Sequence, residues 1–233
     1  ATITLAIGMK RMARRNALVK SLPAVETLGS TTVICTDKTG TITENQMTVL
    51  NIGLPDKSYS VTGTGYRPEG TFTLAANAGK ADVVETTVDQ DRVVNPADDS
   101  ALTDILIGGI LCSNAVITAE GTEYTLVGDP TEGALVAAAR KAGLDRKTLE
   151  ARGWEREEEL PFDSETKYMA VSYFSPHLPK EETRIFLKGA PGVVLNMCSR
   201  TVIDRPSAEP GETSADSFTR TDEQTEPLTE EKR

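Results

Sequence analysis

The sequence predicts an α+β fold in which helices pack on an antiparallel β-sheet. Short segments that are rich in β-branched residues, or that alternate apolar with polar residues, are separated by Gly, Pro and Asp turns, as is typical of strands. Longer segments with helix-capping signals lie between them. Because several strands are joined by short loops and helices are interleaved with them, an antiparallel sheet covered by helices is favoured.

The predicted strands include one clear hairpin. Residues 115–118 (AVIT) and 123–128 (EYTLVG) are separated by AEGT, a short turn that contains glycine. The other predicted strands have the same character and lie at residues 30–36, 47–52, 59–63, 71–74, 167–175 and 183–189.

Three segments predict helices. Residues 100–114 (SALTDILIGGILCSN) begin with Ser100, which we predict to be the N-cap. Residues 131–143 (TEGALVAAARKAG) carry basic side chains in the last turn and end at Gly143, a typical helix terminator. Residues 191–199 (PGVVLNMCS) have proline in the first turn, where it fits a helix without losing a hydrogen bond.

Composition excludes some classes of function. The chain of 233 residues has a net charge of −10, which argues against nucleic acid as a partner, because phosphate backbones are bound by clustered Lys and Arg. Cys35, Cys112 and Cys198 lie far apart in apolar surroundings and lack CxxC spacing. They predict buried reduced thiols rather than disulfides or a zinc site.

The two ends of the chain differ in charge. Residues 1–30 start with an apolar run of about nine residues, half of the ~20 that a membrane-spanning helix needs, and continue with a basic cluster. Such an order is typical of the cytoplasmic side of a membrane helix, and a solvated amphipathic helix is the alternative. Residues 204–233 carry nine acidic and four basic side chains and few apolar ones, which predicts a flexible loop or tail.

The segment TTVICTDKTGTITENQMTVL, residues 31–50, places Asp37 between a β-branched run and a Gly-Thr turn. A carboxylate at the end of a buried strand is held still, while N–H groups of the following turn point to where an anion can bind. Such an aspartate can form an acyl phosphate, with Mg²⁺ bringing the anionic partners together. Lys38, Thr39 and Thr41 add donors beside it. The spacing alone leaves an ordinary turn as the alternative.

The string CTDKTGTITENQMTV closely resembles the phosphorylation motif of the P-type ATPases, which are ATP-driven ion pumps. The flanking LPAVETLGSTTVI and AIGMKRMARRNALVKSL resemble the approach to that motif in cation-pumping members, of the calcium or sodium/potassium-like group. The resemblance implies that Asp37 accepts the γ-phosphate of ATP. It also implies that Lys38 and Thr39 hold phosphate and Mg²⁺, with Asp37 and Thr39 as metal ligands.

Position 39 separates a pump from a related phosphatase. In haloacid-dehalogenase-type phosphatases the residue two places after the nucleophile is a second aspartate, which acts as general acid and base. Thr39 cannot do this at neutral pH, so the acyl phosphate should persist, as a pump requires. A soluble phosphatase or phosphotransferase of that type and a non-enzymatic nucleotide-binding module remain the alternatives.

Two further patches resemble the nucleotide-binding domain of the same family. In VGDPTEGALV, Asp129 and Glu132 lie at the start of a helix, where capping of the helix is the alternative interpretation. The resemblance implies that Glu132 reaches the adenine amino group and that Asp129 belongs to the nucleotide site. In LPFDSETKYMAV, the resemblance implies that Phe162 stacks on adenine while Lys167 and Met169 line the pocket. A phenylalanine in the hydrophobic core is the alternative for Phe162.

A third patch, FLKGAPGVVL, places Lys188 at the end of a strand, before Gly189 and a helix. Lys188 thereby projects at a helix N-terminus, where anions bind readily, and resembles the family lysine that meets the nucleotide, with Gly189 in the same site. A solvated surface lysine is the alternative. The chain departs from the family at Gly192, where the usual residue is Glu.

The resemblance implies a division of the chain into four parts. These are the cytoplasmic end of a membrane helix with its stalk (1–30), the first strand and phosphorylation loop of an α/β phosphorylation domain (31–45), a nucleotide-binding domain (46–203) and an acidic flexible loop or tail (204–233). Because later motifs of the family are missing, we expect a soluble, monomeric fragment of a membrane protein. It should bind ATP without turnover, and the complete protein would move a cation.

Overall fold

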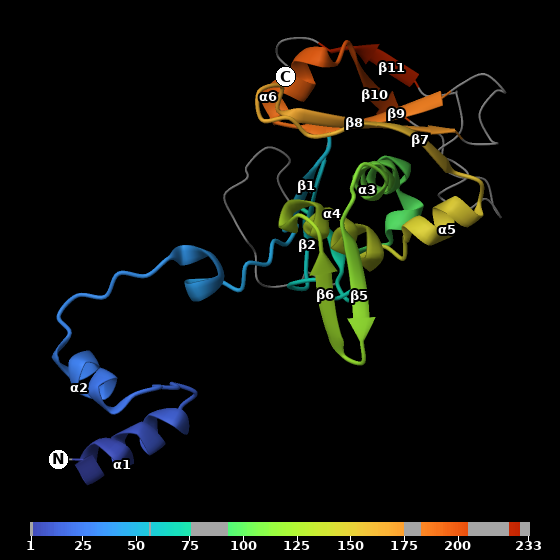
Figure 1. Ribbon diagram of the computed structural model, residues 1–233. Helices are drawn as coiled ribbons and strands as arrows, with labels where there is room; N and C mark the ends of the chain where they lie inside the picture. The colour runs from blue at the N-terminus through green and yellow to red at the C-terminus, as the bar shows by residue number, and fades with distance from the viewer. Residues whose placement is uncertain (1, 56, 76–92, 175–182, 205–223, 229–233) are drawn as a thin grey trace. The chain divides into compact units, whose positions relative to one another are not determined.

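The computed structural model divides the chain into two compact units, residues 1–45 and residues 46–233 (Figure 1). It describes residues 2–55, 57–75, 93–174, 183–204 and 224–228. In the second unit every strand pairing within these ranges is antiparallel, and helices pack against the strands. The predicted α+β class is therefore confirmed.

The first unit consists of helices and turns. Its elements are α1 (Thr2–Ala13), α2 (Leu22–Ser30) and the helical turn η1 (Lys38–Ile42). No residue of α1 or α2 is buried. Across the parts of the chain that the structure describes, no helix combines the length and the apolar character that crossing a bilayer requires.

The strand predicted for residues 30–36 is not formed. Ser30 ends α2, and residues 31–37 are irregular. Val33 and Ile34 are 72% and 75% exposed, although a buried strand would cover them. A strand depends on hydrogen bonds to a neighbouring strand, and the described residues of this unit contain none. The β-branched run therefore has strand propensity but no partner that could express it.

The second unit contains small antiparallel sheets. The first has the order β1 (Asn51–Gly53), β2 (Ser58–Val61), β3 (Phe72–Leu74), β4 (Val93–Val94). A hairpin is formed by β5 (Val116–Glu120) and β6 (Glu123–Val127), and Gly121 at its turn has φ of +62°, which suits glycine. The hairpin predicted from the sequence is therefore confirmed.

A three-stranded sheet carries Met169 and Lys188, two residues of the predicted nucleotide site. Its order is β7 (Glu155–Leu160), β8 (Tyr168–Phe174), β9 (Thr183–Gly189). Side chains of β8 alternate, so that Met169, Val171 and Tyr173 are buried. Met169 lies opposite Lys188 in the β8–β9 pairing, which places Lys188 on the same face as these buried side chains.

The second unit also contains helices η3 (Pro96–Asp98), α3 (Ser100–Leu111), α4 (Pro130–Lys141), α5 (Arg146–Ala151) and α6 (Pro191–Met197). Of these, α3 and α6 contact strand β9 of the sheet. The apolar α3 packs against both α4 and β9, as Figure 1 shows. Trp154, Tyr173 and Phe186 form an aromatic cluster in this core, with ring centroids 5.9 to 6.3 Å apart.

The structure corrects the predicted cap of one helix and confirms the predicted end of another. Ser100 is the first residue of α3 and not its cap, because the Oδ1 atom of Asp99 accepts the N–H of Leu102 at 3.1 Å. Aspartate one position earlier takes the capping role that serine would otherwise fill. Gly143 follows the end of α4 with φ of +74°, as predicted, and its N–H donates to the carbonyl of Arg140.

Some elements were missed or differ from the prediction. Helix α5 and strands β4, β7 and β10 (Arg200–Asp204) were not predicted; β7 has the sequence EREEEL and lacks any apolar alternation. β10 pairs with β11 (Gln224–Pro227), which lies inside the segment predicted to be flexible. The rest of that segment, residues 205–223 and 229–233, lies outside the described residues.

The three cysteines are free thiols, but they differ in exposure. Cys112, which caps the end of α3, is 1% exposed, whereas Cys35 is exposed and Cys198 is partly exposed. The prediction of three buried thiols is therefore right for Cys112 alone. Cys35 belongs to the β-branched run that has no strand partner and so remains uncovered.

Candidate functional site

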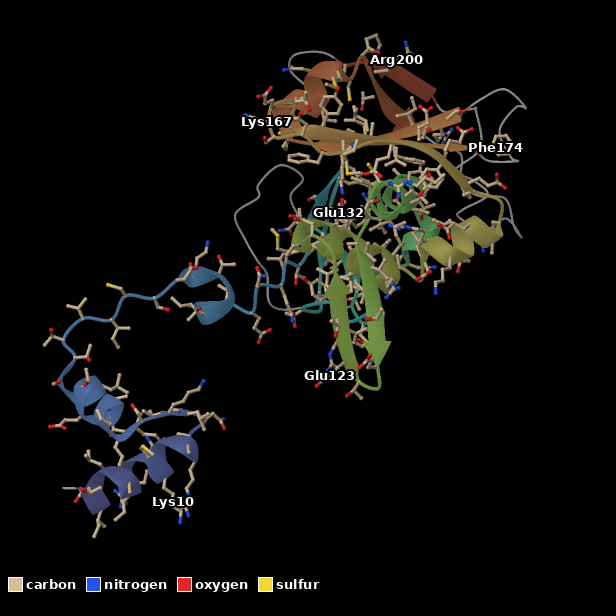
Figure 2. The ribbon with its side chains drawn as sticks, in the orientation of Figure 1. Lys10, Glu123, Glu132, Lys167, Phe174 and Arg200 are labelled. Atoms are coloured by element: carbon tan, nitrogen blue, oxygen red, sulfur yellow. The ribbon has the colours of Figure 1, made fainter. Side chains whose placement is uncertain are left out.

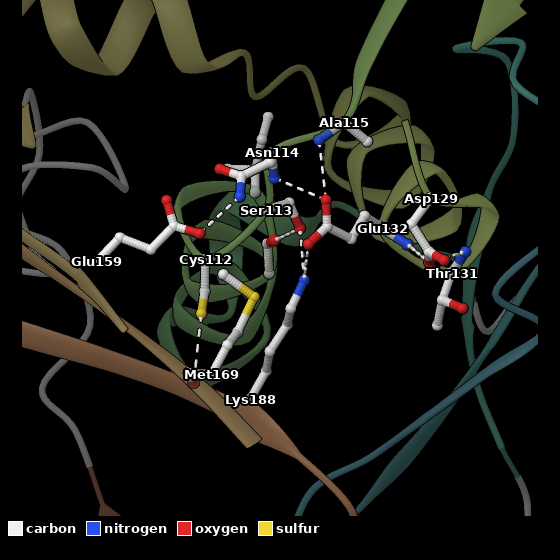
Figure 3. A network of polar contacts seen from close by, with 12 residues as sticks. Cys112, Ser113, Asn114, Ala115, Asp129, Thr131, Glu132, Glu159, Met169 and Lys188 are labelled. Carbon is white, nitrogen blue, oxygen red and sulfur yellow. Dashed lines mark hydrogen bonds and ion pairs between the residues drawn. The ribbon is translucent and has the colours of Figure 1, made fainter. Parts of the chain in front are cut away.

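An ion pair between Glu132 and Lys188 lies at the centre of a polar network in the second unit (Figure 3). Glu132 is in the first turn of α4, and Lys188 is in β9. The Nζ atom of Lys188 lies 2.7 Å from Oε1 of Glu132, and the side chains are 24% and 15% exposed. The pair is thus partly shielded from water, where a charge-assisted hydrogen bond is stronger than on an open surface.

The second oxygen of Glu132 is also engaged. Oε2 accepts the backbone N–H groups of Asn114 and Ala115, at 2.7 and 2.9 Å. Burial alone would raise the pKa of Glu132, but the hydrogen bonds from Lys188 and Asn114 outweigh it and hold the pKa below its usual value. Glu132 is therefore an ionised carboxylate that joins the first turn of α4 to the turn between α3 and β5.

Lys188 has a second polar neighbour. Its Nζ lies 3.4 Å from the hydroxyl of Ser113, a fully buried side chain that donates to the carbonyl of Gly109 at 2.6 Å. Beneath it, the thiol of Cys112 donates to the carbonyl of Phe186 at 3.5 Å, and burial raises the pKa of this thiol. Cys112 is a neutral packing residue, and the ammonium of Lys188 lies above it at the rim of the core.

A ring of polar contacts extends the network to β7. The side chain of Asn114 donates through Nδ2 to Glu159 at 2.7 Å and accepts from Arg156 at 2.8 Å. Arg156 closes the ring by its ion pair with Glu159 at 3.0 Å. Since both ends of the Asn114 amide are used, the turn that donates to Glu132 is fixed to the sheet as well as to α4.

Asp129 lies beside Glu132 and caps α4. Its Oδ1 accepts the N–H groups of Thr131 and Glu132, at 2.8 and 3.3 Å. Burial works against ionisation, but these hydrogen bonds prevail and lower the pKa of Asp129. The capping interpretation is thus met by the geometry, while a contact of Asp129 with nucleotide stays a prediction.

The other predicted nucleotide residues differ in exposure. Phe162 is 61% exposed, so its ring is outside the core and available for stacking. Met169 is 2% exposed and therefore belongs to the core, next to Lys188 in Figure 3. Lys167 has φ of +62°, and its carbonyl accepts the N–H of Ala190 at 2.9 Å. Gly189 packs against this turn so closely that a Cβ would lie 2.6 Å from Cβ of Tyr168.

Asp37 lies in the first unit and forms a local turn. Its Oδ1 accepts the N–H of Thr39 at 3.4 Å, and Gly40 has φ of +73°. Asp37, Lys38 and Thr39 are all exposed. No group of three His, Cys, Asp or Glu side chains that could hold a metal ion occurs among the described residues. One carboxylate and one hydroxyl do not by themselves make a magnesium site, since Mg²⁺ requires six oxygen ligands.

Sequence reasoning missed the residues that support the pair. Ser113 and Asn114 are the last two residues of the segment predicted to be a helix, but α3 ends at Leu111, so they lie in the turn before β5. Arg156 and Glu159 lie in a strand that was not predicted. The one local signal was the presence of two polar residues directly after the apolar run of α3. Their partners lie elsewhere in the chain, so only the folded structure identifies them.

Comparisons with known proteins identify a family for this chain. The family profile described as "P-type ATPase, cytoplasmic domain N" matches residues 101–231. The chain is 39% identical over 203 residues to the cation-transporting ATPase pma1 of Synechocystis, covering 87% of the chain and 21% of that protein. It is 38% identical over 207 residues to a calcium-transporting ATPase of Bacillus subtilis, covering 89% of the chain and 21% of that protein.

A human relative is similar to the same degree. The calcium-transporting ATPase type 2C member 1 of Homo sapiens is 41% identical over 199 residues, which cover 85% of the chain and 19% of that protein. The chain thus spans about a fifth of the length of the relatives it matches. The match of the domain profile to more than half of the chain establishes the family, and the chain belongs to the P-type ATPases.

Proposed function

We propose that the second unit binds ATP beside the Glu132–Lys188 pair, as the nucleotide-binding domain of a cation-transporting P-type ATPase. The observation that carries the proposal is the position of Lys188: its ammonium is partly exposed, yet Glu132 and Ser113 hold it in place. A fixed cation at the edge of an apolar core is suited to an anionic ligand with an aromatic base. The descriptions of the family and of the relatives as cation or calcium transporters support the assignment.

Each predicted site residue has a role in this proposal. Phe162 offers an exposed ring on which adenine stacks. Lys188 binds phosphate oxygen through an N–H that its two protein partners leave available. Met169 supports the pocket from the core side. Lys167, in the turn before β8, and Gly189, at the end of β9, pack closely beside Lys188 and would set the shape of the pocket wall.

The first turn of α4 completes the site. Asp129 and Glu132 are both ionised and both hold backbone N–H groups. Neither would attract a phosphate by charge. Asp129 therefore serves the site through the conformation of the turn, and Glu132, as the family resemblance implies, would reach the adenine amino group.

In the complete protein, Asp37 would be the phosphorylation site. A carboxylate oxygen of Asp37 would attack the γ-phosphorus of ATP; an acyl-phosphate bond forms, the bond from that phosphorus to the β–γ bridging oxygen breaks, and ADP leaves. Lys38 and Thr39 would hold the transferred group. Mg²⁺ would offset the repulsion between the two anions, and we derive no step through it, because the described residues supply only part of a metal site.

The energy of this step would drive cation transport. The complete protein would then be embedded in a membrane, with this region on its cytoplasmic side. For the 233-residue chain itself we propose a soluble monomer that binds ATP without turnover. Asp37 lies in an exposed turn, and positioning of the nucleophile supplies most of the catalysis in phosphoryl transfer.

Calorimetric titration with ATP, AMP and GTP tests the proposal. We expect saturable binding that prefers adenine, and weaker binding in Phe162→Ala and Lys188→Ala. Ile185→Ala and Lys147→Ala are matched controls, since Ile185 is 67% exposed on β9 and Lys147 is exposed in α5. Absence of binding by the folded wild type, or equal losses in the control variants, would refute the assignment of the site.

The same samples separate the alternatives. Incubation with ATP followed by acid quenching should leave no acid-stable phosphate on the chain. Release of phosphate from a small phosphate ester would instead favour a soluble phosphatase of the haloacid-dehalogenase type.

A further inference from the structure

We infer that the loop of residues 62–71, between β2 and β3, is a clamp that fixes residues 46–48 to helix α4. Residues 46–48 are the point at which the chain enters the second unit. Lys141 of α4 holds one side of the loop, and residues 46–48 lie against the other side. The clamp goes beyond the proposed function and does not depend on it, since its contacts are made within the protein chain.

Two threonines close the loop at its base. The N–H of Thr62 donates to the carbonyl of Thr71 at 3.0 Å, and the N–H of Thr71 donates to the hydroxyl of Thr62 at 2.9 Å. The two hydroxyls lie 2.8 Å apart, so they are hydrogen-bonded as well. These contacts continue the antiparallel pairing of β2 with β3. Both ends of the loop are therefore fixed, and the residues between them move together.

Lys141, the last residue of α4, holds the first side of the loop. Its Nζ donates to the carbonyls of Thr62 and Gly63, both at 2.8 Å. The loop backbone follows the lysine stem closely: a Cβ at Gly70 would lie 2.8 Å from Cδ of Lys141, and a Cβ at Gly63 would collide with the carbonyl oxygen of Glu69. Gly63 also has φ of +83°, which favours glycine. The glycines thus let the loop pass over Lys141.

The chain that enters the second unit contacts the other side of the loop. The N–H of Gly65 donates to the hydroxyl of Thr48 at 3.1 Å. A Cβ at Gly65 would lie 2.5 Å from Oε1 of Gln46, so this side chain lies directly against the loop backbone. Burial raises the pKa of the Tyr66 hydroxyl, and the interaction of this hydroxyl with the backbone of Met47 partly offsets the rise. Three successive residues of the entering chain therefore contact the loop.

Tyr66 and Met47 join this side of the clamp to the start of α4. Tyr66 is 6% exposed, and its ring packs on the helix so closely that a Cβ at Gly133 would lie 3.0 Å from Cε1 of the ring. The hydroxyl of Thr131 lies 3.5 Å from Sδ of Met47. Helix α4 thus holds the clamp near both of its ends. A shift of α4 would be transmitted through the loop to residues 46–48, and from there to the segment that carries Asp37.

Backbone amide NMR relaxation of the 233-residue chain tests the clamp, because order parameters report the local rigidity of each amide in the folded state. In the wild type we expect order parameters of about 0.85 at Met47 and Thr48, the value of rigid backbone. In Lys141→Met we expect both to fall below about 0.6, although the described bonds of Lys141 are to Thr62 and Gly63. Lys147→Met is the matched control, since Lys147 is exposed in α5.

A second variant opens the clamp from its other side. Tyr66→Phe combined with Thr48→Val removes the two hydroxyls through which the loop and the entering chain interact, and we expect the same loss of rigidity at Met47 and at residue 48. The control combines Tyr124→Phe with Thr125→Val, which removes the same two groups from β6, directly after Glu123 at the tip of the hairpin in Figure 2. Thermal unfolding confirms that each variant is folded. If Lys141→Met does not fold, the second variant decides alone.

Several results would overturn the clamp. Flexible amides at Met47 and Thr48 in the wild type would mean that the loop does not hold them. Rigid amides at both positions in the folded variants would mean that they are held without it. A loss of rigidity in the second variant but not in Lys141→Met would mean that the loop acts without α4, and equal losses in the controls would mean that the effect is unspecific. Because no nucleotide is added, none of these results bears on the proposed binding of ATP.

Discussion

Gly189 offers a sharp test of how closely the end of β9 is packed against residues 167 and 168. It ends β9 directly after Lys188, and an added Cβ would lie 2.6 Å from Cβ and 2.8 Å from Cα of Tyr168, with the carbonyl oxygen of Lys167 closer still. Real Cβ atoms are not found at such distances from backbone atoms. The Gly189→Ala substitution must therefore move either the turn at Lys167 or the end of β9.

The loss of stability expected for Gly189→Ala depends on which atoms must move. Inserting a methyl group into a well-packed site costs about 1–3 kcal/mol, and here rigid backbone atoms rather than a flexible side chain must give way. We expect Gly189→Ala to lower the free energy of unfolding by about 2 kcal/mol. Because the shift displaces Lys188, ATP binding should weaken as well.

Urea unfolding followed by tryptophan fluorescence measures the effect, since Trp154 is the single tryptophan and is 1% exposed in the core. Gly192→Ala is the matched control: no atom lies within 4 Å of its Cβ position, and it sits in α6. Alanine in a helix should stabilise by up to about 1 kcal/mol relative to glycine. The reasoning is refuted if the two alanine variants have the same stability.

Three further predictions concern other parts of the structure. Burial opposes ionisation of Asp99, but its ion pair with Lys57 prevails and lowers its pKa. The stability that this pair contributes is complete above the unfolded pKa of 3.8 and is lost as the pH falls below it. Asp99→Asn should therefore make the free energy of unfolding less dependent on pH in the acid range. Lys141→Met leaves two carbonyls unpaired that now accept from Nζ at 2.8 Å, and urea titration should show a loss of about 1–3 kcal/mol. In the folded chain Cys35 should react at once with an aromatic disulfide, while Cys112 should react only after unfolding.

The strands show how much of the sheet the local sequence pattern predicts. Alternation of apolar and polar residues predicted strands at 167–175 and 183–189, and the structure has them at Tyr168–Phe174 and Thr183–Gly189. The pattern does not contain the pairing between strands. That Lys188 faces Met169, and therefore the core side of the sheet, became known only from the register.

Strand β7 is an element that the local sequence does not predict. EREEEL has no apolar alternation, and all six of its residues are exposed, so nothing in the local sequence favours a strand. It forms because β8 offers a pairing edge, and it then brings Arg156 and Glu159 to Asn114. The start of helix α4 was easier to predict from the sequence, since its cap Asp129 and its first residue Pro130 act within one turn of the backbone.

The candidate residues for binding and for chemistry are supported in different ways. Glu132 and Lys188 lie on a helix and a strand of one packed core, and their side chains contact each other and the turn at Asn114. Asp37 lies in an exposed turn whose described side-chain hydrogen bond is to its own neighbour, Thr39. The proposed binding of ATP needs one fixed cation and one exposed aromatic ring, whereas phosphoryl transfer needs the nucleophile aligned with the γ-phosphate. The proposed binding residues therefore lie in a packed core, whereas the proposed nucleophile lies in an exposed turn. For this reason we expect variants at Lys188 to change ATP affinity, while Asp37→Asn leaves that affinity unchanged.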